Sequence, residues 1–390
     1  MKYDFETMID RLHSDSIKWH VKENELPMWI ADMDFKVAPE IIEAMEERVK
    51  HGVFGYCEPD ENWKDAYVSF YKDRHALSIN KDWLLFSEGV VPTISSSVRK
   101  LTSVGDQVVV LSPVYNIFYN SIINNGRIVR QVPLLFKGDS YSIDWKGLEE
   151  AFKEEKTTLM ILCNPANPIS KIWTKEELSK IGFLARKYGV VVLSDEIHGE
   201  ITRPGTSYVP YLSADKENAK MSVIAVSPTK CFNLASLHSS AVIVPDLGLR
   251  KRVDRQLNTD EVAEPSTLAI VGAEAALNEG RAWLDEMREK VFENRDEAKE
   301  FLTRELPEVT LVDSNATYLL WLNISKVASD STELLNYLRE KTGLILSDGK
   351  AYGGNGSHFL RMNVACPTSL LEDGLERLKK GIKSYLSEKK

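Results

Sequence analysis

The sequence predicts an α/β fold with a mostly parallel β-sheet, followed by a smaller α+β unit. Short segments rich in apolar residues alternate with amphipathic, helix-like segments through the middle of the chain. Several of the short segments are apolar at both odd and even positions, which is typical of strands buried on both faces of a parallel sheet. After about residue 248 the pattern becomes helical and charged, and then mixes short strands with helices.

The predicted sheet strands follow one another in chain order, with helix-like stretches between them. They are residues 83–86, 107–111, 158–163, 190–193, 222–226 and 241–244. Residues 176–187 have a helical pattern, and Gly189 follows them as a helix C-cap would.

The predicted smaller unit begins with a long helix and ends with another. Its elements are a helix at 284–306, strands at 310–312 and 318–322, a helix at 331–342, a strand at 359–364 and a helix at 369–386. The glycine-rich stretch 353–356 is a loop and not a dinucleotide-binding fingerprint, because no strand–turn–helix unit surrounds it. We expect three parts: an N-terminal segment 1–45 that packs on the small domain, a large domain 46–285 and a small domain 286–390.

Composition excludes several classes of protein. The 390 residues are 43% hydrophobic with a net charge of -9, which disfavours nucleic acid or an anionic membrane as the main partner. The four cysteines lie far apart and form no CxxC pair, so neither a metal site nor a disulfide framework is indicated. No segment has the roughly 18 continuous apolar residues of a membrane helix. We expect a reduced, cytoplasmic protein.

Two neighbouring predicted strands end in residues that carry chemistry. Asp195 follows an apolar run that ends at residue 193, and Lys230 follows the strand 222–226. The carboxyl ends of parallel strands form the crevice in which open α/β sheets bind ligands. A lysine that can form a Schiff base and an acid that keeps a pyridine nitrogen protonated are the pair that pyridoxal 5′-phosphate (PLP) chemistry needs. Taken alone, Lys230 would be an ordinary surface lysine, and Asp195 a helix cap or the partner of an arginine.

Three further features extend this pair. The turn 89–93 precedes a helix, with Pro92 suited to its first position, and the free N–H groups there form an anion site. The loop 164–168 contains two prolines, which hold Asn167 over the crevice. Arg361 lies in an otherwise apolar strand, where a substrate carboxylate would satisfy its guanidinium. In isolation each is also compatible with a routine turn or a structural salt bridge.

In this order and spacing the motifs resemble the fold-type I PLP enzymes of the aspartate aminotransferase class, over nearly the whole chain. They resemble most the branch of cystathionine β-lyases and cysteine-S-conjugate β-lyases, the MalY/PatB family. The strings that carry the resemblance are PMWIADMDF at 27–35, SDEIH at 194–198, KCFNLA at 230–235 and FLRMNVACP at 359–367. The resemblance implies a large domain with a seven-stranded sheet, PLP as cofactor, and cleavage of cystathionine or related cysteine S-conjugates.

The resemblance also implies roles for residues around the cofactor ring. Lys230 would bind the cofactor covalently and move protons, Asp195 would pair with the pyridine nitrogen, and Tyr115 would stack on the ring. These three form the expected catalytic set. Asn167 would contact the phenolic oxygen, and His198 is expected among the cofactor-binding residues.

Further residues would bind the phosphate and the substrate. The backbone of Val90 and Val91 and the side chain of Ser227 would donate to the phosphate. Tyr56 would reach the phosphate of a neighbouring subunit, which implies a homodimer with shared active sites. Arg361 would bind the substrate carboxylate, together with the backbone near Ala31.

The sequence departs from the family pattern at a few positions. Ala166 stands where the family has histidine, and Ile169 and Ser170 stand where glycine and arginine are usual. His238 occupies a position at which aminotransferases often have a phosphate-binding arginine, and histidine is a weaker, pH-dependent cation. These changes affect the expected substrate and rate rather than the cofactor.

Two other functions remain open at this point. An aminotransferase would share every residue up to the loss of the α-proton and differ in where the proton returns. A regulatory binding protein could keep the fold and act through a partner surface, although the Lys230, Asp195 and Arg361 set argues against a purely structural role. No GKS/T loop supports a nucleotide-dependent enzyme.

Overall fold

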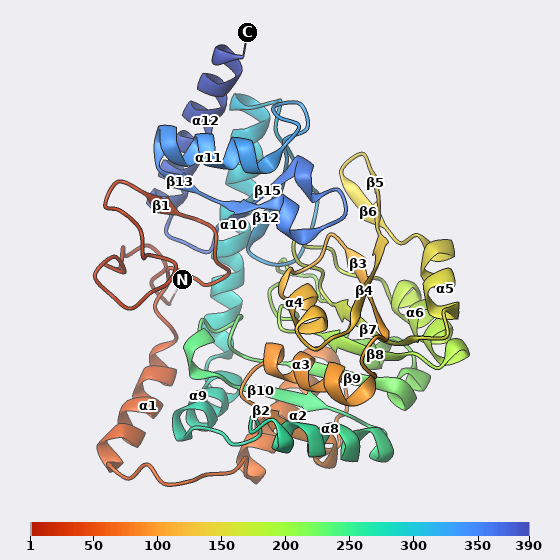
Figure 1. The fold of residues 1–390 in the computed structure, drawn as a ribbon. Helices are drawn as coiled ribbons and strands as arrows, with labels where there is room; N and C mark the ends of the chain where they lie inside the picture. Colours follow the sequence, from red (N-terminus) through yellow and green to blue (C-terminus); the bar gives the residue numbers. More distant parts are fainter. Residues whose placement is uncertain (1, 390) are drawn as a thin grey trace.

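The computed structural model describes residues 2–389, and a seven-stranded β-sheet forms its centre (Figure 1). In spatial order the strands are β2 (Leu84–Ser87), β10 (Ser240–Ile243), β9 (Ser222–Val226), β8 (Val191–Asp195), β7 (Thr157–Cys163), β3 (Gln107–Ser112) and β4 (Ile128–Pro133). Neighbouring strands run parallel except β10, which is antiparallel to both β2 and β9. The sheet is therefore mostly parallel, which confirms the predicted fold class.

Both faces of this sheet are buried. Val108 and Val110 of β3 lie in one apolar cluster, whereas Val109 and Leu111 lie in another. Helices on each face make this possible, and they explain why the strand sequences are apolar at both parities. The covering helices are α2 (Glu61–His75), α3 (Val90–Leu101), α4 (Ile117–Ile123), α5 (Trp145–Lys153), α6 (Lys175–Tyr188) and α8 (Leu247–Thr259).

A smaller antiparallel sheet forms the C-terminal unit. Its strands, in spatial order, are β11 (Thr310–Leu311), β12 (Leu319–Asn323), β15 (Phe359–Asn363) and β14 (Ser347–Asp348). Helices α11 (Ser331–Thr342) and α12 (Thr368–Glu388) share a third apolar cluster with it. The N-terminal strand β1 (Leu26–Pro27) pairs with β13 (Leu344–Ile345), so an early part of the chain packs on this unit.

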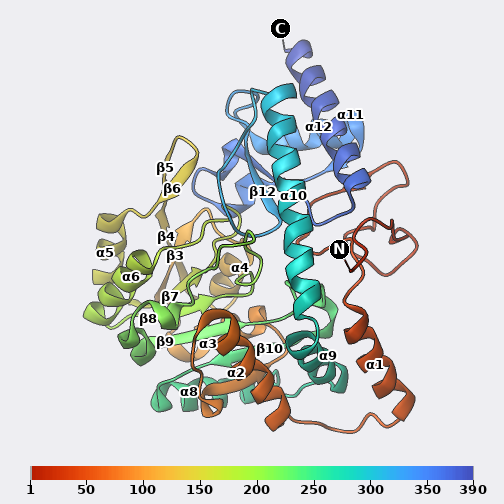
Figure 2. The ribbon, with the colours of Figure 1, turned by 180° about the vertical axis from the view of Figure 1, so that it is seen from behind.

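Helix α10 (Arg281–Glu305) links the two units, and Figure 2 shows it running from one to the other. Its Trp283 and Leu284 belong to the cluster of the large sheet, whereas Ala298 and Leu302 belong to that of the small sheet. The predicted domain limits at residues 45 and 285 stay predictions. The remaining elements are α1 (Pro39–His51), α7 (Tyr211–Ala214), α9 (Thr267–Asn278), the hairpin β5 (Leu135–Lys137) and β6 (Ser140–Ser142), and short 3₁₀ turns. Among residues 2–389, no helix has the length and apolar character needed to span a membrane.

The predicted strands lie within two residues of those in the structure, but several short or edge strands were not predicted and one helix start differs. Strand β4 was not predicted, because it lies at the sheet edge and most of its side chains are at least partly exposed. Helix α3 begins at Val90, so Pro92 is its third residue and not its first. Proline is tolerated there because the N–H groups of the first turn have no partner within the helix.

Candidate active site

Lys230 and Asp195 line one cavity at the carboxyl edge of the large sheet. Strands β8 and β9 run parallel, with Asp195 opposite Ala225. Strand β8 ends at Asp195, and after the end of β9 at Val226 the chain turns through residues 227–229 to Lys230. The cavity they line has a volume of about 240 Å³. Its position is the one at which open α/β sheets bind ligands.

The Asp195 carboxyl group is buried, with a side chain only 3% exposed. Its Oδ1 accepts a hydrogen bond from the N–H of Ile197 at 3.1 Å. Burial raises the pKa of Asp195 to about 7; the Ile197 N–H and Lys230 oppose this shift, and the charge of Glu196 adds to it. A cation placed beside Asp195 would therefore be held by a carboxylate that is otherwise costly to ionise.

The Lys230 amine reaches the backbone of the N-terminal segment. Its Nζ donates to the carbonyl oxygen of Ala31 at 2.6 Å, and the Tyr318 hydroxyl donates to the same oxygen at 3.1 Å. Burial lowers the pKa of Lys230, Arg361 adds to this effect, and nearby carboxylates oppose it. An amine with a lowered pKa is more available as a nucleophile or base near neutral pH.

The N-terminus of helix α3 closes another side of the cavity, through Gly89, Val90 and Val91. The Thr93 N–H donates to Gly89 O at 3.1 Å, so the N–H groups of Val90 and Val91 precede the helical ladder. Unpaired N–H groups and the helix dipole together favour an anion. Glu88, Thr229, His238 and Ser239 also line this cavity.

Arg361 on β15 is a buried cation, 5% exposed, and within residues 2–389 no carboxylate is among its hydrogen-bond partners. Its Nη2 donates to Trp29 O at 2.8 Å and to Ser347 Oγ at 3.2 Å. Its Nη1 donates to Asn167 Oδ1 at 3.1 Å, and its carbon Cζ lies 5.0 Å from the Tyr352 ring centroid. Its Nε is buried without a hydrogen-bond partner among residues 2–389. This guanidinium is suited to bind an anionic ligand.

A second, more open cavity of about 730 Å³ begins at Arg361. It shares Ala31, Tyr115 and Lys230 with the first cavity, so the two are adjacent. Lys230 therefore lies between the N-terminus of α3 and the Arg361 guanidinium, both of which favour an anion. A ligand whose carboxylate meets Arg361 has room for its side chain in the outer cavity.

Tyr115 and His198 line the first cavity as uncharged groups. Burial raises the pKa of Tyr115 to about 12. Burial, together with the charges of Lys230 and Arg361, lowers the pKa of His198 to about 3, so its imidazole stays neutral near pH 7. The Nδ1 of His198 is buried without a hydrogen-bond partner among residues 2–389. Both side chains can therefore contact a ring without adding charge.

Two of the predicted site residues, Tyr56 and Ser227, line neither the first nor the second cavity. Tyr56 is fully exposed, in the segment between α1 and α2. The Ser227 hydroxyl donates to Ser239 O at 2.6 Å and lies 2.7 Å from Thr229 Oγ1. Ser227 thus supports the loop that carries Thr229 and Ser239. Its role as a phosphate donor, and that of Tyr56, stay predictions.

The departures from the family pattern fall in different places. Ile169 is fully buried in the main apolar cluster, and Ser170 Oγ donates to Leu319 O at 2.8 Å. These two residues connect the loop after β7 to the small sheet and do not line either cavity. The Ala166 N–H donates to Lys171 O at 2.9 Å, within the same loop. His238, by contrast, lines the first cavity.

Sequence reasoning missed several residues around the site. Thr229 and Ser239 line the first cavity, and the carbonyl of Trp29 accepts from Arg361. Asn233 and Asn363 hold the backbone next to Ala31. Asn233 and Asn363 follow the candidate lysine and arginine by three and two residues, but the sequence does not show which backbone groups their amides contact.

The chain matches the family model of the aminotransferases class I and II over residues 25–378. It is 39% identical to the cystathionine beta-lyase PatB of Bacillus subtilis (strain 168), over 96% of this chain and 99% of that protein. Identity to the protein MalY of Escherichia coli (strain K12) is 30%, over 98% of this chain and 99% of that protein. The crystal structure of cystalysin from Treponema denticola, which contains pyridoxal 5′-phosphate, matches with a TM-score of 0.95 at 31% identity, over 98% of this chain and 100% of that one.

Proposed function

The chain belongs to the class I and II aminotransferase family, and on this basis we propose that it is a PLP-dependent carbon–sulfur β-lyase. Its proposed substrates are L-cystathionine or related cysteine S-conjugates, which it converts with water to pyruvate, ammonia and a thiol. The observation that carries the proposal is the shared cavity of Lys230, Asp195 and the α3 N-terminus, next to Arg361. The likeness to PatB and MalY favours this reaction over transamination.

The residues fit the cofactor on physical grounds. PLP has an aldehyde, a ring nitrogen and a phosphate, and the cavity offers an amine, a buried carboxyl group and a helix N-terminus. Asp195 is difficult to ionise without a cation beside it, and a protonated ring nitrogen is such a cation. Lys230 would hold the cofactor covalently, and the N–H groups of Val90 and Val91 would hold its phosphate.

Other residues would complete the cofactor site. The neutral rings of Tyr115 and His198 are suited to pack beside the pyridine ring, and the Asn167 amide to contact its oxygen. His238 is the side chain proposed to reach the phosphate.

When bound, PLP supplies an electron sink for the pair left on the substrate α-carbon after its proton is lost. Arg361 binds the substrate carboxylate and so orients the α-carbon. Lys230 removes the proton from that carbon, and a positioned base of this kind contributes roughly 10²–10⁴-fold. Burial lowers the pKa of Lys230, which makes it a competent base. The thiolate then leaves the β-carbon with the bonding pair, and water converts the remaining three-carbon fragment to pyruvate and ammonia.

The test is pyruvate release from L-cystathionine by the purified, PLP-loaded protein in the absence of any keto acid. We expect pyruvate and thiol in equal amounts, and none from Lys230→Ala. A protein that releases no pyruvate but transfers the amino group when a keto acid is added would be an aminotransferase, and the lyase proposal would be wrong. A protein that binds no PLP would favour a regulatory role instead.

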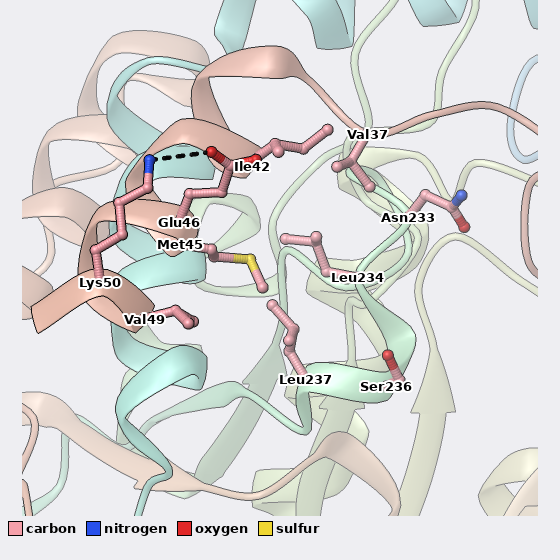
Figure 3. Close-up of a pocket in the computed structure, with 10 residues that line it drawn as sticks. All are labelled: Val37, Ile42, Met45, Glu46, Val49, Lys50, Asn233, Leu234, Ser236 and Leu237. Carbon is pink, nitrogen blue, oxygen red and sulfur yellow. Dashed lines mark hydrogen bonds and ion pairs between the residues drawn. The ribbon is translucent and has the colours of Figure 1, made fainter. Parts of the chain in front are cut away.

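We also propose a homodimer in which Tyr56 completes the site of the other subunit. Tyr56 is fully exposed, and its neighbour Phe54 is more than half exposed. An apolar groove of about 490 Å³ lies between α1 and the segment after Lys230 (Figure 3). Its apolar side chains are Val37, Ile42, Met45, Val49, Leu234 and Leu237. Apolar grooves at the surface are among the features that mark surfaces which bind another protein.

Mixing two inactive variants tests the shared site. In a hybrid dimer of Lys230→Ala with Tyr56→Ala, one site receives both changes and the other neither. We expect mixtures to recover about a quarter of the wild-type activity, because half of the dimers are hybrids with one intact site. No recovery, or a monomer in sedimentation, would contradict the proposal.

We infer a reducing, cytoplasmic setting from the cysteines, and a place in amino-acid metabolism from the proposed reaction. The four cysteines, Cys57, Cys163, Cys231 and Cys366, are all free thiols. Free, mostly buried cysteines are typical of proteins that stay in reducing compartments.

A further inference from the structure

The backbone segment 29–33 contacts both of the cationic residues that matter for the proposed reaction. Arg361 Nη2 donates to Trp29 O at 2.8 Å, and Lys230 Nζ donates to Ala31 O at 2.6 Å. Two carbonyl groups, two residues apart in one segment, thus hold the side chain of each. The segment belongs to neither a helix nor a strand, and one backbone hydrogen bond lies within it, from the Asp32 N–H to Ile30 O at 3.0 Å. Other groups must hold it in place.

Asn363 holds this segment from the small sheet. It follows Arg361 by two residues on β15 and is 2% exposed. Its Nδ2 donates to Ile30 O and to Asp32 O, both at 2.6 Å, and its Oδ1 accepts from the Ala365 N–H at 2.8 Å. One amide group therefore fixes the carbonyls on both sides of Ala31.

Asn233 holds the same segment from the side of the lysine. It follows Lys230 by three residues, and Figure 3 shows its amide directed away from the apolar groove. Its Nδ2 donates to Met33 O at 3.1 Å and to Phe35 O at 2.9 Å, and its Oδ1 accepts from the Met33 N–H at 3.0 Å. Its φ of 58° is a left-handed conformation that asparagine tolerates better than most residues.

A buried ion pair adds a third attachment. Lys18, 1% exposed, donates to Asp32 O at 3.3 Å and also to the adjacent Asp34 Oδ2 at 2.6 Å. Arg11 Nη1 donates to Met33 O at 2.9 Å and also to Asp34 Oδ1 at 2.6 Å. The segment is thus tied to the lysine loop, to β15 and to the N-terminal residues at once. So many attachments to one irregular stretch indicate that its position matters.

We propose that Asn363 and Asn233 are positioning residues that hold segment 29–33 as a spacer between Lys230 and Arg361. An α-amino acid carries its carboxylate and its α-proton on one carbon, so the base and the guanidinium must keep a fixed separation. A displacement of about 1 Å in such an arrangement can lower the rate roughly 100-fold. Neither asparagine is assigned a contact with the substrate; each acts through the carbonyls that it holds. This inference rests on the proposed function in one respect, that the ligand is an α-amino acid.

The test compares Asn363→Ala with a matched control, Asn294→Ala. Asn294 lies on α10 and is 1% exposed, and its Nδ2 donates to Val364 O at 2.9 Å and to Cys366 O at 2.8 Å. The control thus loses two hydrogen bonds from a buried amide to backbone carbonyls close to Asn363, but none to segment 29–33. For each PLP-loaded protein we would measure the thermal midpoint, the dissociation constant of L-alanine from the change in cofactor absorbance, and KM and kcat for elimination.

We expect similar losses of thermal stability in the two variants, but different binding. The dissociation constant of L-alanine and the KM should rise about tenfold or more in Asn363→Ala and change less than about twofold in Asn294→Ala. If both variants change binding equally, or neither does, Asn363 is merely structural and the proposal is wrong. L-alanine has no leaving group at its β-carbon and cannot undergo elimination. Its dissociation constant therefore tests the role of segment 29–33 separately from the lyase proposal.

Asn233→Gly provides an independent test, because glycine accepts the left-handed backbone without strain. Loosening segment 29–33 near Lys230 should shift the pH at which the visible absorbance of the loaded protein titrates, relative to the wild type and to Asn294→Ala. An unchanged titration would refute the role of Asn233. Should Asn363→Ala fail to fold, this variant decides the question alone.

Discussion

Asp195→Asn should stabilise the cofactor-free protein while it damages the active site. Burial raises the pKa of Asp195 from 3.8 to about 7, so the folded protein favours the neutral carboxyl group. The stability linked to this group is fully present below pH 3.8 and is lost as the pH rises through 7. Asparagine has nearly the same shape, can still accept from the Ile197 N–H, and never ionises.

The size of the effect follows from the two pKa values. At about 1.4 kcal/mol for each tenfold change in the proton equilibrium, the ionisation of Asp195 costs the cofactor-free fold about 4 kcal/mol at pH 8 and about 2 kcal/mol at pH 5. We therefore expect Asp195→Asn to raise the free energy of unfolding at pH 8 by several kcal/mol, and by about half as much at pH 5.

Urea unfolding of the cofactor-free proteins at both pH values measures this difference. Asp246→Asn is the control, because Asp246 is an exposed N-cap of α8 and asparagine caps a helix about equally well. Added PLP should then stabilise the wild type more than Asp195→Asn, since only the wild type offers the ring nitrogen a carboxylate. A variant that is no more stable than the wild type at pH 8, or a difference that does not depend on pH, would refute the reasoning.

Three further predictions concern single substitutions. Arg361→Lys keeps the charge but loses the planar fork, so KM for cystathionine should rise at least about tenfold with unchanged cofactor absorbance; an unchanged KM would remove Arg361 from carboxylate binding. His238→Ala should raise the dissociation constant of PLP about two- to tenfold, with His238→Gln between it and the wild type; equal constants in a dialysis titration would exclude a phosphate contact. Gly349→Ala places a Cβ atom 2.1 Å from Phe359 O and should lower the free energy of unfolding in urea by about 1–3 kcal/mol. Gly55→Ala, whose Cβ atom would have no atom within 4 Å, is the control. Equal stability of the two variants would show that the backbone at Gly349 moves to accommodate the methyl group.

The sequence places Asp195 and Lys230 in one cavity from their positions at or just after strand ends, although neither residue is distinctive by itself. Asp195 ends an apolar run and Lys230 follows the next strand, and both features can be recognised without knowledge of the tertiary fold. Arg361 was visible because a charge interrupts an apolar strand, and the structure shows it buried. Such signals depend on only a few neighbouring residues, so they can be recognised without knowledge of contacts between distant parts of the chain.

Other features depend on contacts between distant parts of the chain and could not be predicted. Strand β4 lies at the sheet edge, where exposure removes the apolar pattern that marks a buried strand. The hydrogen bonds of Asn363 reach carbonyls more than 300 residues earlier, at Ile30 and Asp32. Nothing in the sequence near Asn363 identifies those carbonyls. Every residue has a backbone carbonyl, so the residue types at 30 and 32 do not mark them as partners of the amide. The same holds for Ser227, whose hydroxyl turns to Ser239 O.

The pairing of β1 with β13 has a consequence for how the protein emerges from the ribosome. Leu26 and Pro27 are translated long before Leu344 and Ile345, and at 5–20 residues per second the first strand waits roughly 15–60 s for its partner. The seven-stranded sheet, by contrast, has all its strands once Ile243 has been made. The strands that lead to Asp195 and Lys230 are therefore complete early in synthesis, whereas the strand that carries Arg361 and the residues that hold segment 29–33 come last.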